Sequence, residues 1–324
     1  MKNRRSKNRT KKQKSTRQTA EGLPAPSRLM SEKTMRDLHR VLEGRDFGSV
    51  DEMNAFLASL TGQGLRESLQ DAAPLSLKEE AQELAFAAME AETAAQAEKL
   101  ARRALEKDPD CVDALVLLAE IESNSPRAMI AALEKAVAAG ERSLGADFFQ
   151  LNKGHFWGVI ETRPYMRARL QLAELYRVEG LYPEALRHYE GLLELNPNDN
   201  QGVRDVLLGG YLAIENLDGV RRLLQQYKND YTAVFAWGRT LERFLAGDLR
   251  NAEQELKTAR KRNRFVELYL SGERKIPKSM PAAYSLGSAE EALVCAGCLA
   301  AAWARHKEAV FWLLDQMHPT GPSR

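Results

Sequence analysis

Two cysteines three positions apart, Cys295 and Cys298, are the residues whose spacing most resembles a reactive motif. A redox pair of this spacing needs its first thiolate at a helix N-terminus, where the helix dipole lowers the thiol pKa. Ser288 is predicted to begin this helix, which places Cys295 two turns inside it. A structural zinc site needs four ligands, and His306 is the only nearby addition. We therefore predict that both cysteines pack in a helix interface and bind no metal.

A second candidate is the aromatic group formed by His155, Phe156 and Trp157 in a long joint at 140–163. Such a group could line a ligand pocket, although aromatic side chains more often plug an irregular loop into the core. The other histidines have no ligand spacing, and no phosphate-binding loop, nucleophile elbow or paired-carboxylate motif occurs. The sequence thus predicts a chain with no cofactor that is not an enzyme. An enzyme using this joint or the cysteine pair stays as an alternative.

Arginines supply the third candidate, a partner-binding groove. If helices at 166–179, 199–214 and 231–246 are the first members of stacked helix pairs, one face of each lines a concave surface. Guanidinium groups on that face could bind a peptide carboxylate, while a solvated or internally paired face is the alternative. The predicted groove residues are Arg167, Leu170, Glu174, Arg177, Arg204, Leu208 and Tyr211.

The first seventeen residues form a basic tail without a single acid. They hold nine of the chain's 47 basic residues, so the remaining 38 face all 45 acids and the body has a net charge near −7. Arg4, Arg5, Lys11 and Lys12 are candidates for weak contact with a nucleic acid or another polyanion. A solvated tail and a nuclear-import signal are the other interpretations. No aromatic residue is present for base stacking.

Composition limits where the chain could act. Hydrophobic residues make up 44% and charged residues 28%, as in ordinary soluble proteins. No apolar run approaches the roughly 18 residues of a membrane span, and no apolar core follows the basic N-terminus as in a secretory signal. We therefore expect a cytoplasmic protein. Three cysteines in a chain of this length do not form a disulfide framework.

Helical signals run along nearly the whole chain from residue 31 onward. Apolar residues recur at helical spacing, and Ser49, Ser76 and Ser288 each precede a glutamate by three positions, which predicts a capping box at the start of a helix. Strand-type alternation is absent. The joints are short and polar, so consecutive helices should pack antiparallel.

A 34-residue unit at 166–199 matches the tetratricopeptide repeat pattern. Ala173 and Ala185 occupy the positions where the two helices cross, Gly180 breaks the chain and Pro197 closes the unit. Only Arg169, in the position of the usual tryptophan, departs from the pattern. A second match spans 78–111, and weaker matches follow. The pattern predicts an all-α, tetratricopeptide-like, right-handed α-solenoid of antiparallel helix pairs.

Three further stretches, at 154–169, 196–204 and 269–288, carry a family resemblance. They include Gly154-His155-Phe156-Trp157-Gly158 and Asn196-Pro197-Asn198-Asp199. Over most of residues 76–316 the chain resembles repeat proteins of the suppressor-of-tumorigenicity-seven family. The resemblance implies a helical repeat fold and supplies no catalytic residue. Eukaryotic relatives are membrane-associated, whereas this chain has no predicted span, so their location and role are not transferred.

The predicted organisation has four parts. A disordered basic tail covers 1–29, a small helical segment 30–74, the repeats 75–264 and a C-terminal helical cap 265–324. The predicted function is a scaffold that binds an unidentified protein or peptide in the concave groove. The alternative is a nucleic-acid-associated or ribosome-associated factor that uses the tail. The sequence does not indicate an oligomeric state.

Overall fold

The computed structural model describes residues 28–60 and 63–319, so the basic tail lies outside the described residues. Within these ranges all regular elements are helical and no strand occurs, which confirms the all-α prediction. None of the described helices is long and apolar enough to cross a bilayer. The chain divides between Ala73 and Pro74 into two compact units.

The first unit contains α1 (Arg28–Leu42), α2 (Val50–Ser59) and α3 (Gln63–Gln70). As predicted, α2 begins after Ser49, whose hydroxyl oxygen accepts a hydrogen bond from the Glu52 amide at 3.1 Å. The Glu52 carboxylate accepts from the Gly48 amide at 2.8 Å, one residue before the position that a capping box requires. α1 packs against α3 within this unit.

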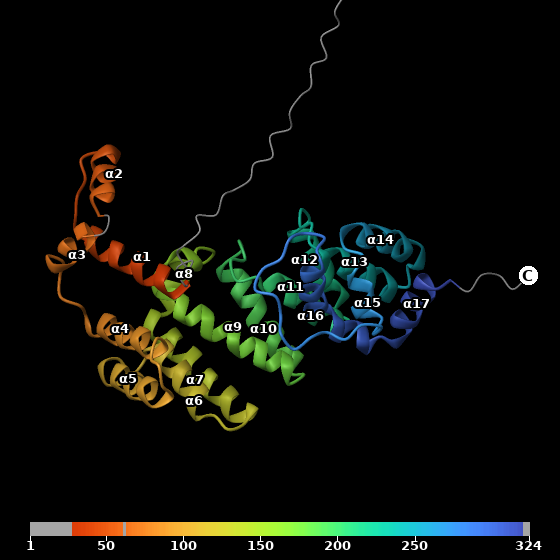
Figure 1. Ribbon diagram of the computed structural model, residues 1–324, viewed down its shortest axis with the longest axis horizontal. Helices are drawn as coiled ribbons and strands as arrows, with labels where there is room; N and C mark the ends of the chain where they lie inside the picture. The colour runs from red at the N-terminus through yellow and green to blue at the C-terminus, as the bar shows by residue number, and fades with distance from the viewer. Residues whose placement is uncertain (1–27, 61–62, 320–324) are drawn as a thin grey trace, which may run out of the picture. The chain divides into compact units, whose positions relative to one another are not determined.

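The second unit contains the remaining helices (Figure 1). Ser76 and Glu79 form the predicted capping box at its start, with the Ser76 amide donating to the Glu79 carboxylate at 2.7 Å. The helices in chain order are α4 (Leu77–Met89), α5 (Ala94–Lys107), α6 (Val112–Glu122), α7 (Pro126–Leu144), α8 (Ala146–Leu151), two short 3-10 helices (Phe156–Gly158 and Ile160–Thr162), α9 (Arg163–Val178), α10 (Tyr182–Leu195), α11 (Val203–Ala213), α12 (Leu217–Gln226), α13 (Ala233–Leu245), α14 (Leu249–Arg262), α15 (Val266–Leu270), α16 (Ala289–Arg305) and α17 (Lys307–Met317).

These helices pack in neighbouring pairs: α4 with α5, α6 with α7, α9 with α10, α11 with α12, and α13 with α14. The second helix of each pair also contacts the first helix of the next, for example α7 with α9 and α10 with α11. Small residues permit the close approach, because Ala173 and Ala185 are completely or almost completely buried where α9 meets α10. Gly180 (φ +77°) turns the chain between these two helices.

The last two long helices depart from this pairwise arrangement. An irregular segment follows α15 and leads into α16, which packs against α11, α13 and α15 (Figure 1). α17 packs against α16 and α13. Trp237 of α13 and Trp303 of α16 are both fully buried, with ring centroids 6.4 Å apart. α16 is therefore part of the core of the second unit.

Candidate functional site

The predicted groove residues of α9 lie in polar contacts that cross between helices. Arg167 donates to the Asp113 carboxylate at 2.7 Å, and Gln82 donates to the same carboxylate at 2.7 Å. These contacts join α4, α6 and α9. Asp113 is almost fully buried, and the two donors offset the free-energy cost of removing its carboxylate from water. Leu170 is half-buried and packs against the apolar core.

The other two α9 residues, Glu174 and Arg177, form an ion pair one helical turn apart, at 2.6 Å. The Tyr189 hydroxyl of α10 donates to the same Glu174 carboxylate at 2.6 Å. Burial of the Tyr189 ring, followed by the charge of Glu174, raises the pKa of this hydroxyl, so it stays a donor at neutral pH. Both charged side chains remain partly exposed, at 35% for Glu174 and 24% for Arg177.

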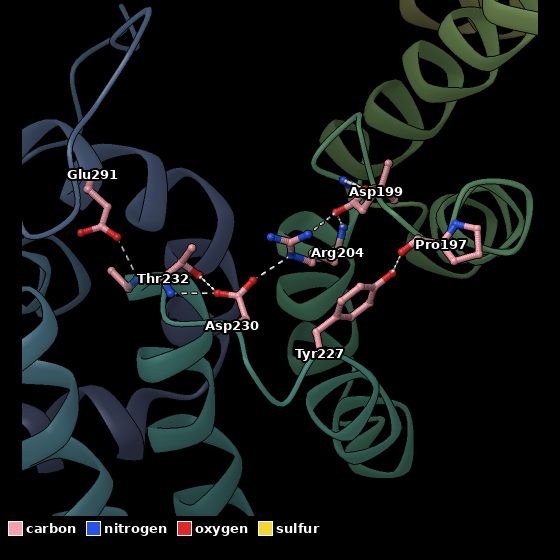
Figure 2. Close-up of polar contacts among 9 residues, drawn as sticks. Pro197, Asp199, Arg204, Tyr227, Asp230, Thr232 and Glu291 are labelled. Carbon is pink, nitrogen blue, oxygen red and sulfur yellow. Dashed lines mark hydrogen bonds and ion pairs between the residues drawn. The ribbon is translucent and has the colours of Figure 1, made fainter. Parts of the chain in front are cut away.

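Arg204 was predicted to face a partner, yet its guanidinium is engaged within the chain (Figure 2). Its Nε donates to Asp230 at 2.8 Å, and a second nitrogen lies 3.6 Å from Asp199. Its cationic carbon lies 5.3 Å from the Tyr227 ring centre, and the Tyr227 hydroxyl donates to the carbonyl of Pro197 at 3.0 Å. The arginine thus ties the start of α11 to the joint that precedes α13, which fits the internally paired alternative.

The two acids beside Arg204 also satisfy backbone donors. Asp199 accepts from the amides of Val203 and Arg204, at 2.6 and 3.1 Å, in the first turn of α11. Asp230 accepts from the amide and hydroxyl of Thr232, at 2.8 and 2.7 Å, immediately before α13 (Figure 2). Negative charge at these two helix starts is favourable because it satisfies donors that the helix leaves unpaired.

Leu208 does not line an open groove, and this part of the prediction is wrong, whereas Tyr211 lines a cleft between α10 and α12. Leu208 is completely buried, and its side chain packs against Gly238 of α13. Tyr211 is 6% exposed, and its hydroxyl donates to Glu190 of α10 at 2.5 Å. Helical periodicity identified residues on an apolar face, but that face packs against neighbouring helices.

The chain's own helix α16 packs on α11 and α13, two of the helices that were expected to form the groove. A Cβ on Gly209 of α11 would clash with the carbonyl oxygen of Cys298, so the two helices make backbone-to-backbone contact. The Glu291 carboxylate accepts from the amide of Ala233 at the start of α13, at 3.0 Å (Figure 2). At the other end, His306 Nε2 lies 2.9 Å from the carbonyl oxygen of Leu212.

Glu291 has a structural role that the sequence analysis did not predict. Its predicted capping contact is present in part, because its amide donates to the Ser288 hydroxyl at 3.1 Å. Its carboxylate instead accepts from Ala233, from Asn263 at 3.0 Å and from Gly287 at 2.7 Å. A glutamate three residues after a serine signals a cap in any helix, so the sequence carried no local sign of these distant donors.

One carboxyl oxygen near α16 has no hydrogen-bond partner in the part of the chain that the structure describes. The Asp205 Oδ1 atom is buried and makes no hydrogen bond among the described residues. Burial, followed by the charge of Asp230, raises the pKa of this carboxyl to about 7, whereas Arg204 opposes the shift. The charge of Asp205 in turn contributes to the raised pKa values of Tyr284, Cys295 and Cys298. Asp205 therefore carries a proton more readily than a surface aspartate.

The cysteine pair lies inside α16, as predicted from Ser288. Cys295 is completely buried and Cys298 partly buried. Burial raises both thiol pKa values, which is the opposite of what a nucleophilic or redox-active thiol requires. Over residues 28–60 and 63–319 no three His, Cys, Asp or Glu side chains are grouped closely enough to hold a metal ion.

The predicted joint at 140–163 is largely helical, because it holds the end of α7, α8 and two 3-10 helices, and its aromatic residues form a plug. Phe156 is completely buried, and its ring centre lies 4.9 Å from that of Phe149 and 6.4 Å from that of Tyr165. His155 is exposed, so it does not join this cluster. Trp157 is half-buried and stacks with the Arg163 guanidinium at 5.3 Å. The packing interpretation is confirmed for Phe156.

The polyanion candidates Arg4, Arg5, Lys11 and Lys12 all lie outside the described residues. No family model matches the sequence, and no curated protein matches it.

Proposed function

We propose that the chain is a non-catalytic interaction scaffold built from tetratricopeptide-like antiparallel helix pairs that form an α-solenoid similar to the suppressor-of-tumorigenicity-seven family. The pairwise packing of α4 to α14 and the buried alanines at the helix contacts support this architecture. A partner protein or peptide binds along the first helices of the pairs, in the cytoplasm.

The observation that carries this proposal is the seating of α16 along α11 and α13. The first helices of these pairs present a surface that accepts another helix, with a backbone contact at Gly209 and polar contacts from Glu291 and His306 at the two ends. Helix-in-groove recognition likewise lays the apolar face of a helix into a groove of the binding protein. A surface of this kind on neighbouring first helices is suited to a partner helix.

Because α16 already occupies α11 and α13, we place the partner-binding surface on α6 and α9 instead. We define the α6–α9 face by Glu120, Leu170, Gln171, Glu174 and Arg177, which are at least partly exposed. Gln171 donates to Glu120 at 2.7 Å and so joins the two helices at this surface. Leu170 adds an apolar side chain between charged neighbours. Of the predicted groove residues, this face retains Leu170, Glu174 and Arg177.

Paired substitutions test this proposal in the full-length chain. Glu120→Arg with Gln171→Arg adds bulk and positive charge to the α6–α9 face, while Glu253→Arg with Gln254→Arg makes the same changes on exposed positions of α14. We expect the variant with Glu120→Arg and Gln171→Arg to capture roughly tenfold less partner protein from native cells than the wild type does, because a desolvated mismatch at an interface costs more than about 1.4 kcal/mol. The variant with Glu253→Arg and Gln254→Arg should capture as much partner protein as the wild type does.

The alternative function rests on the nine basic residues of the tail. A nucleic-acid-associated factor would lose its captured proteins when the lysate is treated with nuclease or when salt is raised from about 50 to 200 mM. Capture that is sensitive to nuclease and unchanged by Glu120→Arg with Gln171→Arg would favour this alternative and reject the α6–α9 face.

A further inference from the structure

We infer that the second unit has an additional binding site, a basic cleft between α12 and α14 that accepts a short acidic peptide segment. The cleft has a volume of about 640 Å³, within the range of sites for small ligands. α13 forms its floor, and the joint before α13 closes one side. Its basic and aromatic lining residues are Arg221, Lys228, Tyr231, Arg239, Arg243 and Arg262.

The cleft has an excess of positive charge. Five basic and three acidic side chains line it, which leaves +2 (five minus three). Asp230 is already paired with Arg204 at 2.8 Å, which lies outside the cleft. Glu242 is shared by Arg221 at 2.7 Å and Arg243 at 3.5 Å. Each of these arginines also pairs with an acid outside the cleft, Arg221 with Asp218 at 4.0 Å and Arg243 with Asp248 at 3.7 Å. Lys228, Arg239 and Arg262 have no acidic partner within the part of the chain that the structure describes.

The donors of this cleft are partly fixed before any ligand binds. Glu242 is 3% exposed, and its carboxylate holds Arg221 through Nε, so other N–H groups of that guanidinium remain for a ligand. Arg262 stacks on Tyr231, with its cationic carbon 5.0 Å from the ring centre. Pre-positioned arginines lose less side-chain freedom on binding, which favours affinity.

Helix electrostatics do not explain the whole cluster. Arg262 lies in the last turn of α14, where a basic residue is favourable because of the helix dipole. Arg239 lies in the middle of α13 and gains nothing from a helix C-terminus, whereas Lys228 directly follows the C-cap of α12 and does. The cleft is also separate from the α16 contact, because Trp237 on another side of α13 packs against α16.

The lining favours a peptide over a nucleic acid. Asp230, Glu242 and Glu255 line the same cleft and would repel a continuous phosphate backbone. Tyr231 is 60% exposed, but the Arg262 guanidinium already covers one face of its ring. The half-buried Leu224 offers apolar contact between the charged groups. Two carboxylates on a short peptide would balance the +2 charge and could accept bidentate hydrogen bonds from arginine.

Carbodiimide coupling of hexaglutamate to the full-length protein tests this inference. The reagent activates a carboxylate, and a lysine amine held close to it forms the amide and releases the urea before water hydrolyses the activated group. Mass spectrometry identifies the lysine. Lys228 belongs to the cleft, whereas Lys257 is exposed on α14 outside the cleft and serves as an internal reference. We expect Lys228 to couple at least tenfold more than Lys257.

Arg239→Gln and, separately, Arg262→Gln should reduce Lys228 coupling roughly tenfold, because each removes one charge-assisted contact. Arg250→Gln, at an exposed position of α14 outside the cleft, should leave it unchanged. The exposed Arg262 is the safer substitution if the half-buried Arg239 proves necessary for folding. Coupling confined to lysines of the basic tail, or equal coupling of Lys228 in all variants, would overturn the inference.

Competition separates the ligand classes. Excess unlabelled hexaglutamate should suppress the coupling of isotope-labelled hexaglutamate to Lys228, while hexaglutamine should not. If inorganic phosphate or hexauridylate suppresses coupling at Lys228, relative to coupling at Lys257, at lower concentration than hexaglutamate does, the cleft is a phosphate site and the assignment to an acidic peptide is wrong. This outcome does not depend on the α6–α9 face, so the two proposals fail independently.

Discussion

The contact between α11 and α16 at Gly209 makes a quantitative prediction about stability. Replacing glycine by alanine inside a helix normally stabilises it by about 1 kcal/mol, because alanine has the higher helix propensity. At Gly209 the added methyl group would meet the backbone carbonyl of Cys298, which cannot rotate away as a side chain can. The helices must therefore separate. A gap of about 0.5–1 Å forfeits a quarter to a half of the dispersion energy of the contacts concerned.

The expected cost of Gly209→Ala follows from these terms. Overpacking in a close-packed core costs about 1–3 kcal/mol, and we take the upper end because backbone atoms oppose each other. Subtracting the helix-propensity gain of about 1 kcal/mol leaves a loss of about 2 kcal/mol. For a unit of this size the loss lowers the melting temperature by roughly 4–8 °C. Thermal unfolding followed by far-ultraviolet circular dichroism measures it.

Gly297→Ala is the matched control, because Gly297 also lies in a helix and also faces a close neighbour. A Cβ there would approach the terminal methyl group of Met280 at 2.9 Å, and this flexible side chain can move aside. We expect this variant to melt at the wild-type temperature or slightly above it. If Gly209→Ala is as stable as the wild type, or if both variants lose equally, the backbone contact between α11 and α16 is not tight.

Two further predictions concern ionisable groups near α16. Because burial raises the pKa of Asp205 to about 7, its folded form retains a proton that the unfolded chain loses near pH 4, so the free energy of unfolding should fall as pH rises from about 4 to 7. Asp205→Asn should remove this part of the pH dependence, and at pH 8 its free energy of unfolding should exceed that of the wild type by about 2–4 kcal/mol. The exposed Asp218→Asn, as the control, should keep the pH dependence and the stability of the wild type. Parallel pH profiles of Asp205→Asn and the wild type would contradict this prediction. Burial raises the pKa values of the Cys295 and Cys298 thiols, so a thiol reagent should label them only after urea unfolding, and rapid labelling of the native protein would show that α16 opens.

Local structure could be predicted from short stretches of sequence because its causes are local. Ser49, Ser76 and Ser288 each precede a helix, as predicted, since a serine hydroxyl satisfies an amide in the first turn regardless of the surrounding fold. The buried alanines of α9 and α10 were identified from spacing for a similar reason. The helix α3 has only a weak signal of its own within the predicted helical segment 30–74, because its eight residues are mostly polar and its contact with α1 is not visible in its own pattern.

The candidate groove could not be predicted as fully, because Leu208 packs against Gly238 of α13 and because α16, about ninety residues further along the chain, packs on α11. Helical spacing placed Leu208 on an apolar face, but it could not show whether solvent, a partner or the chain itself covers that face. The composition of α16 held the missing signal: small and apolar residues surround nearly its whole circumference between Ala292 and Trp303. A helix without a continuous polar side is expected to be buried on several sides.

Arg204 shows why charge alone did not identify a binding residue. The sequence places acids near it only at Asp199 and Asp205, within five residues, and gives no sign that Asp230 returns to the same point. In the folded chain Asp230 and Asp199 together hold the guanidinium, so substituting glutamate for Arg204 would bring another negative charge into an acidic cluster. Loss of partner binding in such a variant would report unfolding around α11. Arg239 and Lys228 differ because no described acid neutralises them, and it is this excess charge, rather than the presence of arginine, that marks a surface able to bind an anionic partner.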